Sequence, residues 1–134
     1  IINVASAAAF GAPPGMAAYN VSKAGTLSLS ETLAAELAGT GINVTALCPP
    51  TFVKTNIVEA GRISGQSTQL ADQLMRWIGF SPPERVARMC LDTLDRGGLY
   101  CMPQPDARIG WGGIKRFTPT VFTRAVGFTT RITT

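Results

Sequence analysis

The sequence contains no histidine, and this absence excludes several classes of catalytic site at once. A Ser-His-Asp hydrolase, a Cys-His protease and a His-ligated metal centre all need an imidazole. Cysteine is also scarce: Cys48, Cys90 and Cys101 are odd in number, widely spaced and never part of a C-x-x-C pair. This usage favours buried, reduced thiols over a disulfide framework, and we expect no metal site.

Two further features are missing from the sequence. No secretory signal opens it, and no uncharged stretch free of Pro and Gly approaches the ~20 residues of a membrane span. A cytoplasmic protein is therefore the expectation. Acidic residues are absent from 107–134, which hold five basic residues, whereas residues 1–106 hold seven basic and eight acidic ones. We therefore divide the chain into a main domain, 1–106, and a basic, aromatic C-terminal extension, 107–134.

Three apolar runs rich in β-branched residues predict buried strands. They are IINVAS (1–6), INVTALC (42–48) and LYCM (99–102). A loop is expected at 7–15 and a helix at 17–38, in which Leu29, Leu33 and Leu37 recur every four residues. Strands that alternate with helices predict a parallel sheet with right-handed crossovers. Ligands of such sheets bind beyond the carboxyl ends of the strands, where Ser6, Pro49 and Met102 are found.

The second half of the domain contains a long connection and one clear helix start. The connection, 51–80, includes one amphipathic helix. In the sequence SPPE, Ser81 and Glu84 predict a capping box with Pro82 at the first helical position. That helix would bury Val86, Met89, Cys90 and Leu94 and end at Gly97-Gly98.

The stretch GMAAYNVSK places Tyr19 and Lys23 four residues apart, on one face of the predicted helix. A phenol is a poor base at pH 7 because its pKa is near 10. One ammonium about 4–5 Å away, at an effective dielectric near 20, can lower that pKa by about 2–3 units. Ser6 precedes Tyr19 by thirteen residues and can hold a carbonyl oxygen against the phenol. Two alternatives stay open: Tyr19 and Lys23 as solvated surface residues, and Ser6 as a turn residue that bonds its own backbone.

Together, INVASAAA, PPGMAAYNVSKAG and GINVTALCPPTFVKTNI resemble the short-chain dehydrogenase/reductase family. In that family a strand ends in N-V-S-S, a Y-x-x-x-K helix follows, and the next strand ends in a P-G-x-x-x-T turn. The resemblance runs from Ile1 to about Met102. It implies an α/β fold, a Rossmann-type parallel sheet flanked by helices. It also implies an NAD(P)-dependent oxidoreductase that interconverts an alcohol and a carbonyl by hydride transfer.

The resemblance also implies roles for individual residues. Tyr19 would be the catalytic acid/base, Lys23 would lower its pKa and hold the nicotinamide ribose, and Ser6 would orient the substrate oxygen. Asn3 would be structural. The implied contacts to the cofactor, NAD or NADP, are Tyr19, Lys23, Pro49, Val53 and Thr55, and those to the substrate are Ser6, Ala7, Tyr19 and Phe52.

The sequence departs from the family pattern at several points. Ala5 replaces the first serine, Pro50 replaces the usual glycine, and the turn to Thr55 is one residue longer, which puts its cofactor contacts in question. The glycine-rich pyrophosphate loop and the residue that selects NAD or NADP are absent. We therefore expect this chain to be the C-terminal half of a longer protein, with about three strands of a doubly wound sheet. Alone it is expected to be inactive, and the full-length protein is expected to be a homo-oligomer.

Other interpretations remain. The extended branch of the superfamily is disfavoured, because its serine or threonine lies about twice as far before the tyrosine. A non-catalytic dinucleotide-binding or interaction module is the main alternative to an enzyme. The extension, 107–134, predicts peripheral membrane contact or packing on its own domain or on a partner subunit. No motif indicates nucleic-acid binding. An apolar stripe in 51–80 indicates a lipophilic substrate or simply core packing; it comprises Phe52, Leu70, Leu74, Trp77, Ile78 and Phe80.

Overall fold

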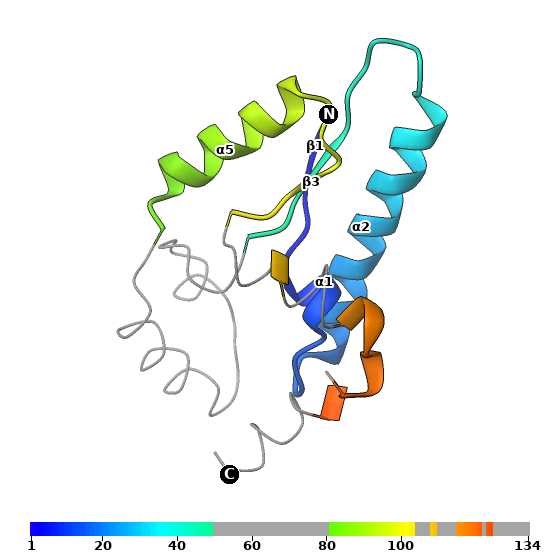
Figure 1. Ribbon diagram of the computed structural model, residues 1–134, viewed down its shortest axis with the longest axis vertical. Coiled ribbons are helices and arrows are strands. Elements are labelled where there is room, and N and C mark those ends of the chain that lie inside the picture. Colours follow the sequence, from blue (N-terminus) through cyan, green and yellow to red (C-terminus); the bar gives the residue numbers. More distant parts are fainter. Residues whose placement is uncertain (50–80, 104–107, 110–114, 122, 125–134) are drawn as a thin grey trace.

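The computed structural model describes residues 1–49, 81–103, 108–109, 115–121 and 123–124 (Figure 1). Some of the predicted features lie outside these ranges. They are the helix and apolar stripe within 51–80, the turn beginning at Pro50, most of the extension, and the site residues Phe52, Val53 and Thr55.

The predicted parallel sheet is confirmed. Its strands are β1 (Ile2–Val4), β2 (Thr45–Leu47) and β3 (Tyr100–Cys101), in the order β1-β2-β3. Both pairings are parallel, and Ala46 of β2 lies opposite Asn3 on one side and Tyr100 on the other. The three carboxyl ends therefore meet at one edge of the sheet, followed in the chain by Ser6, Pro49 and Met102.

Helices cover the sheet. The long helix α2 (Ala17–Glu36) connects β1 to β2, and α5 (Pro83–Asp95) precedes β3. Figure 1 shows the strands lying between these two helices. Among the residues that the structure describes, no helix has the length and apolar character needed to cross a membrane.

A short helix, α1 (Ala8–Gly11), forms where a loop was predicted. Its alanines are strong helix formers, which the adjacent Gly-Pro-rich sequence obscured. It ends because Ala12 adopts a left-handed conformation with φ of 47° and donates its backbone N–H to the Ala8 carbonyl. Pro13 then prevents continuation. The helix directly follows Ser6 and so shapes the edge of the sheet where ligands are expected.

The helix predicted at 17–38 is present as α2, but the leucines that recur every four residues do not make up its buried face. Leu29 is 53% exposed, Leu33 and Leu37 are half-buried, and the helix buries Leu27 and Ser30 instead. A polar contact decides the orientation: Asn3 of β1 donates from Nδ2 to Ser30 Oγ at 3.1 Å. Ser30 is fully buried, so the hydrogen bond between strand and helix forms part of their interface. A pattern of leucines cannot reveal such a polar interface.

The start of α5 differs by one residue from the prediction. The helix begins at Pro83, and Pro82 is its cap, with φ of −57° and ψ of 138° and no side-chain cap hydrogen bond. A residue before proline is forced toward extended backbone, so Pro82 cannot be helical and the Ser81 capping box does not form. Val86 and Cys90 are buried on this helix, as predicted.

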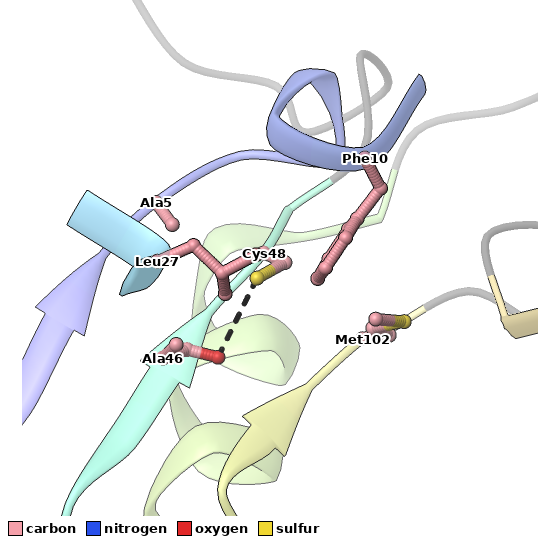
Figure 2. Packing of buried hydrophobic residues seen from close by; sticks show 6 residues of the cluster. All are labelled: Ala5, Phe10, Leu27, Ala46, Cys48 and Met102. Carbon is pink, nitrogen blue, oxygen red and sulfur yellow. Dashed lines mark hydrogen bonds between the residues drawn. The ribbon is translucent and has the colours of Figure 1, made fainter. Parts of the chain in front are cut away.

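A small apolar cluster lies directly beneath the carboxyl edge of the sheet. It contains Ala5, Phe10, Leu27, Ala46, Cys48 and Met102. Figure 2 shows the Phe10 ring pointing from α1 into the space between Cys48 and Met102. The ring also meets Tyr100 edge-on, with centroids 6.0 Å apart. This packing fixes α1, and with it the turn that carries Ser6, against the sheet.

The three cysteines are free and buried, as their spacing predicted. Burial, with smaller contributions from the neighbouring thiols, raises the pKa of Cys48 to about 12. Burial and a hydrogen bond with Cys101 raise the pKa of Cys90 to about 11. Both thiols therefore stay protonated at neutral pH and act as apolar core residues.

Candidate active site

Ser6 lies just beyond the carboxyl end of β1 and is 8% exposed. Its Oγ accepts a hydrogen bond from the Ala8 backbone N–H at 3.1 Å, and its carbonyl accepts one from Ala9 at 3.0 Å. These bonds form the turn into α1, so the structural role considered for Ser6 is present. The hydroxyl proton is not donated to any group in the described part of the chain. It can therefore still be offered to a ligand oxygen.

Tyr19 and Lys23 lie in the first half of α2. Lys23 Nζ is 5.7 Å from the centroid of the Tyr19 ring, within the range of a cation–π contact. The same nitrogen donates a hydrogen bond to the Val4 carbonyl at 3.0 Å, at the carboxyl end of β1. Lys23 thus connects the helix to the strand end that precedes Ser6, and it holds its positive charge beside the phenol. Tyr19 is 38% exposed, so the ring remains accessible.

The segments that follow β1 and β2 lie side by side. Ala5 N–H donates to the Leu47 carbonyl at 2.8 Å, and Ala7 N–H donates to the Pro49 carbonyl at 3.0 Å. The backbone hydrogen bonding between the two strands therefore continues past their ends. It brings Ala7 and Pro49, two of the predicted contact residues, to the same edge of the sheet.

Sequence reasoning overlooked Asn20, the neighbour of Tyr19. Its Nδ2 donates to the Pro13 carbonyl at 2.8 Å, which fastens the proline-containing turn to the first turn of α2. Its Oδ1 is buried and has no hydrogen-bond partner among the described residues. One signal was present in the sequence: asparagine is a poor helix former, so its place in a first helical turn suggests a tertiary contact.

The arrangement fits one end of a nicotinamide dinucleotide. An ammonium group has three protons, and Lys23 uses one on the Val4 carbonyl, which leaves two for the hydroxyls of a ribose. The exposed phenol of Tyr19 lies on the same helix face and can meet a substrate oxygen. Val53 and Thr55, the remaining predicted cofactor contacts, lie outside the described residues.

Comparison with known proteins gives consistent matches. The family model of short chain dehydrogenases matches residues 1–64. The human dehydrogenase/reductase SDR family member 4 is 49% identical over 87 residues, which are 65% of this chain and 31% of that protein. The 1-deoxy-11-beta-hydroxypentalenate dehydrogenase of Streptomyces exfoliatus is 34% identical over 112 residues, or 81% of this chain and 36% of that protein.

A third relative is described as inactive. The inactive 2-(S)-hydroxypropyl-CoM dehydrogenase 2 of Xanthobacter autotrophicus is 40% identical over 105 residues, covering 75% of this chain and 45% of that protein. The chain thus spans between 31% and 45% of the length of these three relatives.

Solved structures match the fold. A short chain dehydrogenase/reductase from Burkholderia phymatum, in complex with NAD, is 27% identical with a TM-score of 0.65. The match covers 87% of this chain and 48% of that one. A short-chain dehydrogenase from Sphingobium yanoikuyae, in complex with NADPH, has a TM-score of 0.66 at 24% identity, covering 92% of this chain and 44% of that one.

Proposed function

The chain belongs to the short-chain dehydrogenase/reductase family, and on that premise we propose that it carries the acid/base site of an NAD(P)-dependent oxidoreductase. The reaction would interconvert an alcohol and a carbonyl. The chain would be the C-terminal half of the catalytic domain, as its sequence predicts. The complete protein would supply the pyrophosphate-binding loop that this sequence lacks, and it would work as a homo-oligomer in the cytoplasm.

One observation carries the proposal. The Lys23 ammonium is 5.7 Å from the Tyr19 ring while it donates to the Val4 carbonyl at 3.0 Å. A lysine on solvated helix surface would extend into water, because holding a long side chain in one geometry costs conformational entropy. Lys23 instead bridges helix and strand end, with its charge beside the phenol. This placement of a positive charge next to the ring supports the use of Tyr19 as the acid/base group.

The roles of the residues follow from their chemistry. Ser6 donates its hydroxyl proton to the substrate oxygen and holds that oxygen toward Tyr19. In the oxidative direction Tyr19 takes the proton of the alcohol hydroxyl as the carbinol carbon loses a hydride. In the reductive direction Tyr19 returns that proton to the carbonyl oxygen. Lys23 compensates the negative charge on the phenolate in both directions and offers its remaining protons to the ribose hydroxyls.

The cofactor would be NAD or NADP, since similar structures contain one or the other. When bound, the nicotinamide accepts or donates the hydride. Tyr19, Lys23 and Pro49 would line its ribose and carboxamide end, together with Val53 and Thr55. Ala7 and Phe52 would contact the substrate beside Ser6. The apolar residues of 51–80 favour a lipophilic alcohol or ketone.

The test is turnover by the intact protein. We expect reduction of NAD⁺ or NADP⁺ with at least one member of a panel of steroid, retinoid, acyl and sugar alcohols. Ser6→Ala should lower that rate by about 10²-fold or more, because the substrate oxygen loses its donor. Ser28→Ala is the matched control, since Ser28 lies exposed on α2, and its rate should be unchanged. Preference for sugars would exclude the lipophilic substrate class.

The alternative function is a non-catalytic dinucleotide-binding module. The relative described as inactive supports considering this alternative. Such a module would bind NAD(P) without turnover on any substrate, and Ser6→Ala would leave that binding unchanged. Calorimetric titration and the turnover assay together separate the two functions: cofactor binding by the intact protein without turnover on any member of the panel would assign the binding module, and turnover that falls in Ser6→Ala would assign the enzyme.

A further inference from the structure

Two apolar side chains among the described residues between 115 and 124 are highly exposed to solvent. Phe117 is 79% exposed, more than any other large hydrophobic residue that the structure describes, and Val121 is 63% exposed. The backbone is helical at 116–117, 119–121 and 123–124, and Thr123 Oγ1 bonds the Pro119 carbonyl at 2.8 Å. Thr118, which separates Phe117 from the next helical residues, is not itself helical. Phe117 and Val121 are both open to solvent within this one short segment, and the two side chains together make up the exposed apolar stripe.

Basic residues flank this stripe. Arg116 directly precedes Phe117, Arg124 follows Val121 by three residues, and both are exposed. They belong to the 28-residue extension that holds five basic residues and no acid, whereas residues 1–106 have a net charge of −1. The positive charge is thus concentrated around the exposed stripe instead of being spread over the molecule.

The segment is attached to the main domain close to the candidate active site. Lys115 Nζ donates a hydrogen bond to the carbonyl of Phe10, which is buried in α1. The charge of Arg116 acts on Tyr100, the ring that meets Phe10 edge-on. Figure 1 shows these orange segments beside α1 and the lower part of α2. They therefore lie at the end of the molecule where Ser6 and Tyr19 are found.

The positive charge and the exposed apolar side chains together indicate which kind of partner binds this segment. A second copy of the chain would bring another positive extension, and the two would repel. A neutral apolar partner would gain nothing from the arginines. An anionic lipid surface can bind both the arginines and the apolar side chains. Its phosphates bind guanidinium groups, and its interface accepts aromatic and aliphatic side chains.

We propose that Arg116, Phe117, Val121 and Arg124 form a docking surface for an anionic phospholipid bilayer. Phe117 and Val121 enter the headgroup boundary, and Arg116 and Arg124 contact lipid phosphates. The anchoring of Lys115 on α1 then holds the Ser6 and Tyr19 end of the molecule near the bilayer. The proposal does not depend on catalysis, so it holds or fails separately from the proposed activity.

The test is co-sedimentation of the intact protein with vesicles. Phosphatidylcholine vesicles serve as the neutral reference, and vesicles with roughly one third phosphatidylserine provide the anionic surface. We expect binding to the anionic vesicles alone, weakened as salt rises from about 0.1 M to 1 M. Arg116→Gln and Arg124→Gln should each lower affinity about fivefold. Phe117→Ser with Val121→Ser should lower it by at least about tenfold.

Val21→Ser is the matched control, because Val21 is 72% exposed on α2, outside the stripe. All of these side chains are exposed, so the variants should fold, which circular dichroism verifies. Equal binding of the unmodified protein to neutral and anionic vesicles, or its failure to bind either, would overturn the proposal, and so would undiminished binding by the Phe117→Ser, Val121→Ser variant. Dissociation of an oligomer by that variant without loss of vesicle binding would assign the stripe to subunit contact instead.

Discussion

Replacing Ser30 by alanine tests how the strand that precedes Ser6 is connected to the helix that carries Tyr19. Ser30 is fully buried, accepts from Asn3 Nδ2 at 3.1 Å and donates to the Thr26 carbonyl at 2.8 Å. Alanine removes both bonds and leaves the Asn3 amide without its partner, a cost of about 1–3 kcal/mol. The better helix propensity of alanine returns about 0.5 kcal/mol. We expect a net loss of about 1–2 kcal/mol in the free energy of unfolding.

Urea denaturation of the intact protein measures this loss. Ser28→Ala is the control, because it changes helix propensity at an exposed position of α2 and should be neutral or slightly stabilising. The double variant with Asn3→Ala should show a coupling of at least about 0.5 kcal/mol, since the two side chains are hydrogen-bonded. Equal stability of Ser30→Ala and Ser28→Ala, or strict additivity with Asn3→Ala, would refute the claim that this contact orients α2.

Two further predictions concern the core. Thiols of the unfolded chain ionise near pH 9.0, whereas folding raises the pKa of Cys48 to about 12 and that of Cys90 to about 11. The unfolded chain therefore binds fewer protons above pH 9, and the free energy of unfolding should fall as pH rises from about 9 toward 11–12, by up to about 1.4 kcal/mol per pH unit per thiol. Urea titrations between pH 7 and 10 test this, and a slope unchanged in Cys48→Ala would contradict it. Phe10→Ala should cost about 3–5 kcal/mol in thermal unfolding, and the exposed control Phe117→Ala less than about 0.5 kcal/mol; equal costs would contradict the placement of Phe10 in the core.

The sheet and its carboxyl edge could be predicted because local pattern and global fold agree there. Each strand is a short β-branched or apolar run that ends at a polar residue or a proline, and a parallel sheet aligns those ends. The spacing of Tyr19 and Lys23 alone put both on one helix face. Ser6 could be located relative to Tyr19 and Lys23 because it lies between a predicted strand and a predicted helix, both of which the sequence pattern indicates.

The errors arose where tertiary contacts outweigh local pattern. The leucines of α2 indicate a helix but not which face it buries: Leu29 is exposed, whereas Ser30, bonded to Asn3, is fully buried. Neither partner signals this contact in the sequence, because the residues are 27 positions apart. The start of α5 depended on the backbone restriction of Pro82 by Pro83, which overrides a favourable capping pattern. Asn20 was overlooked because its partner is a backbone carbonyl, and any residue could supply one.

The central claim, that Tyr19 is the acid/base of a hydride-transfer reaction, is tested most directly by turnover of Tyr19→Phe in the intact protein. Tyr100→Phe is the matched control, because these are the two tyrosines of the chain and Tyr100 Oη instead donates to Glu31 at 2.5 Å. We expect Tyr19→Phe to lower the rate of NAD(P) reduction by about 10²–10⁴-fold while cofactor affinity by calorimetry stays within about threefold. Tyr100→Phe should retain full turnover. Undiminished turnover by Tyr19→Phe would contradict the account.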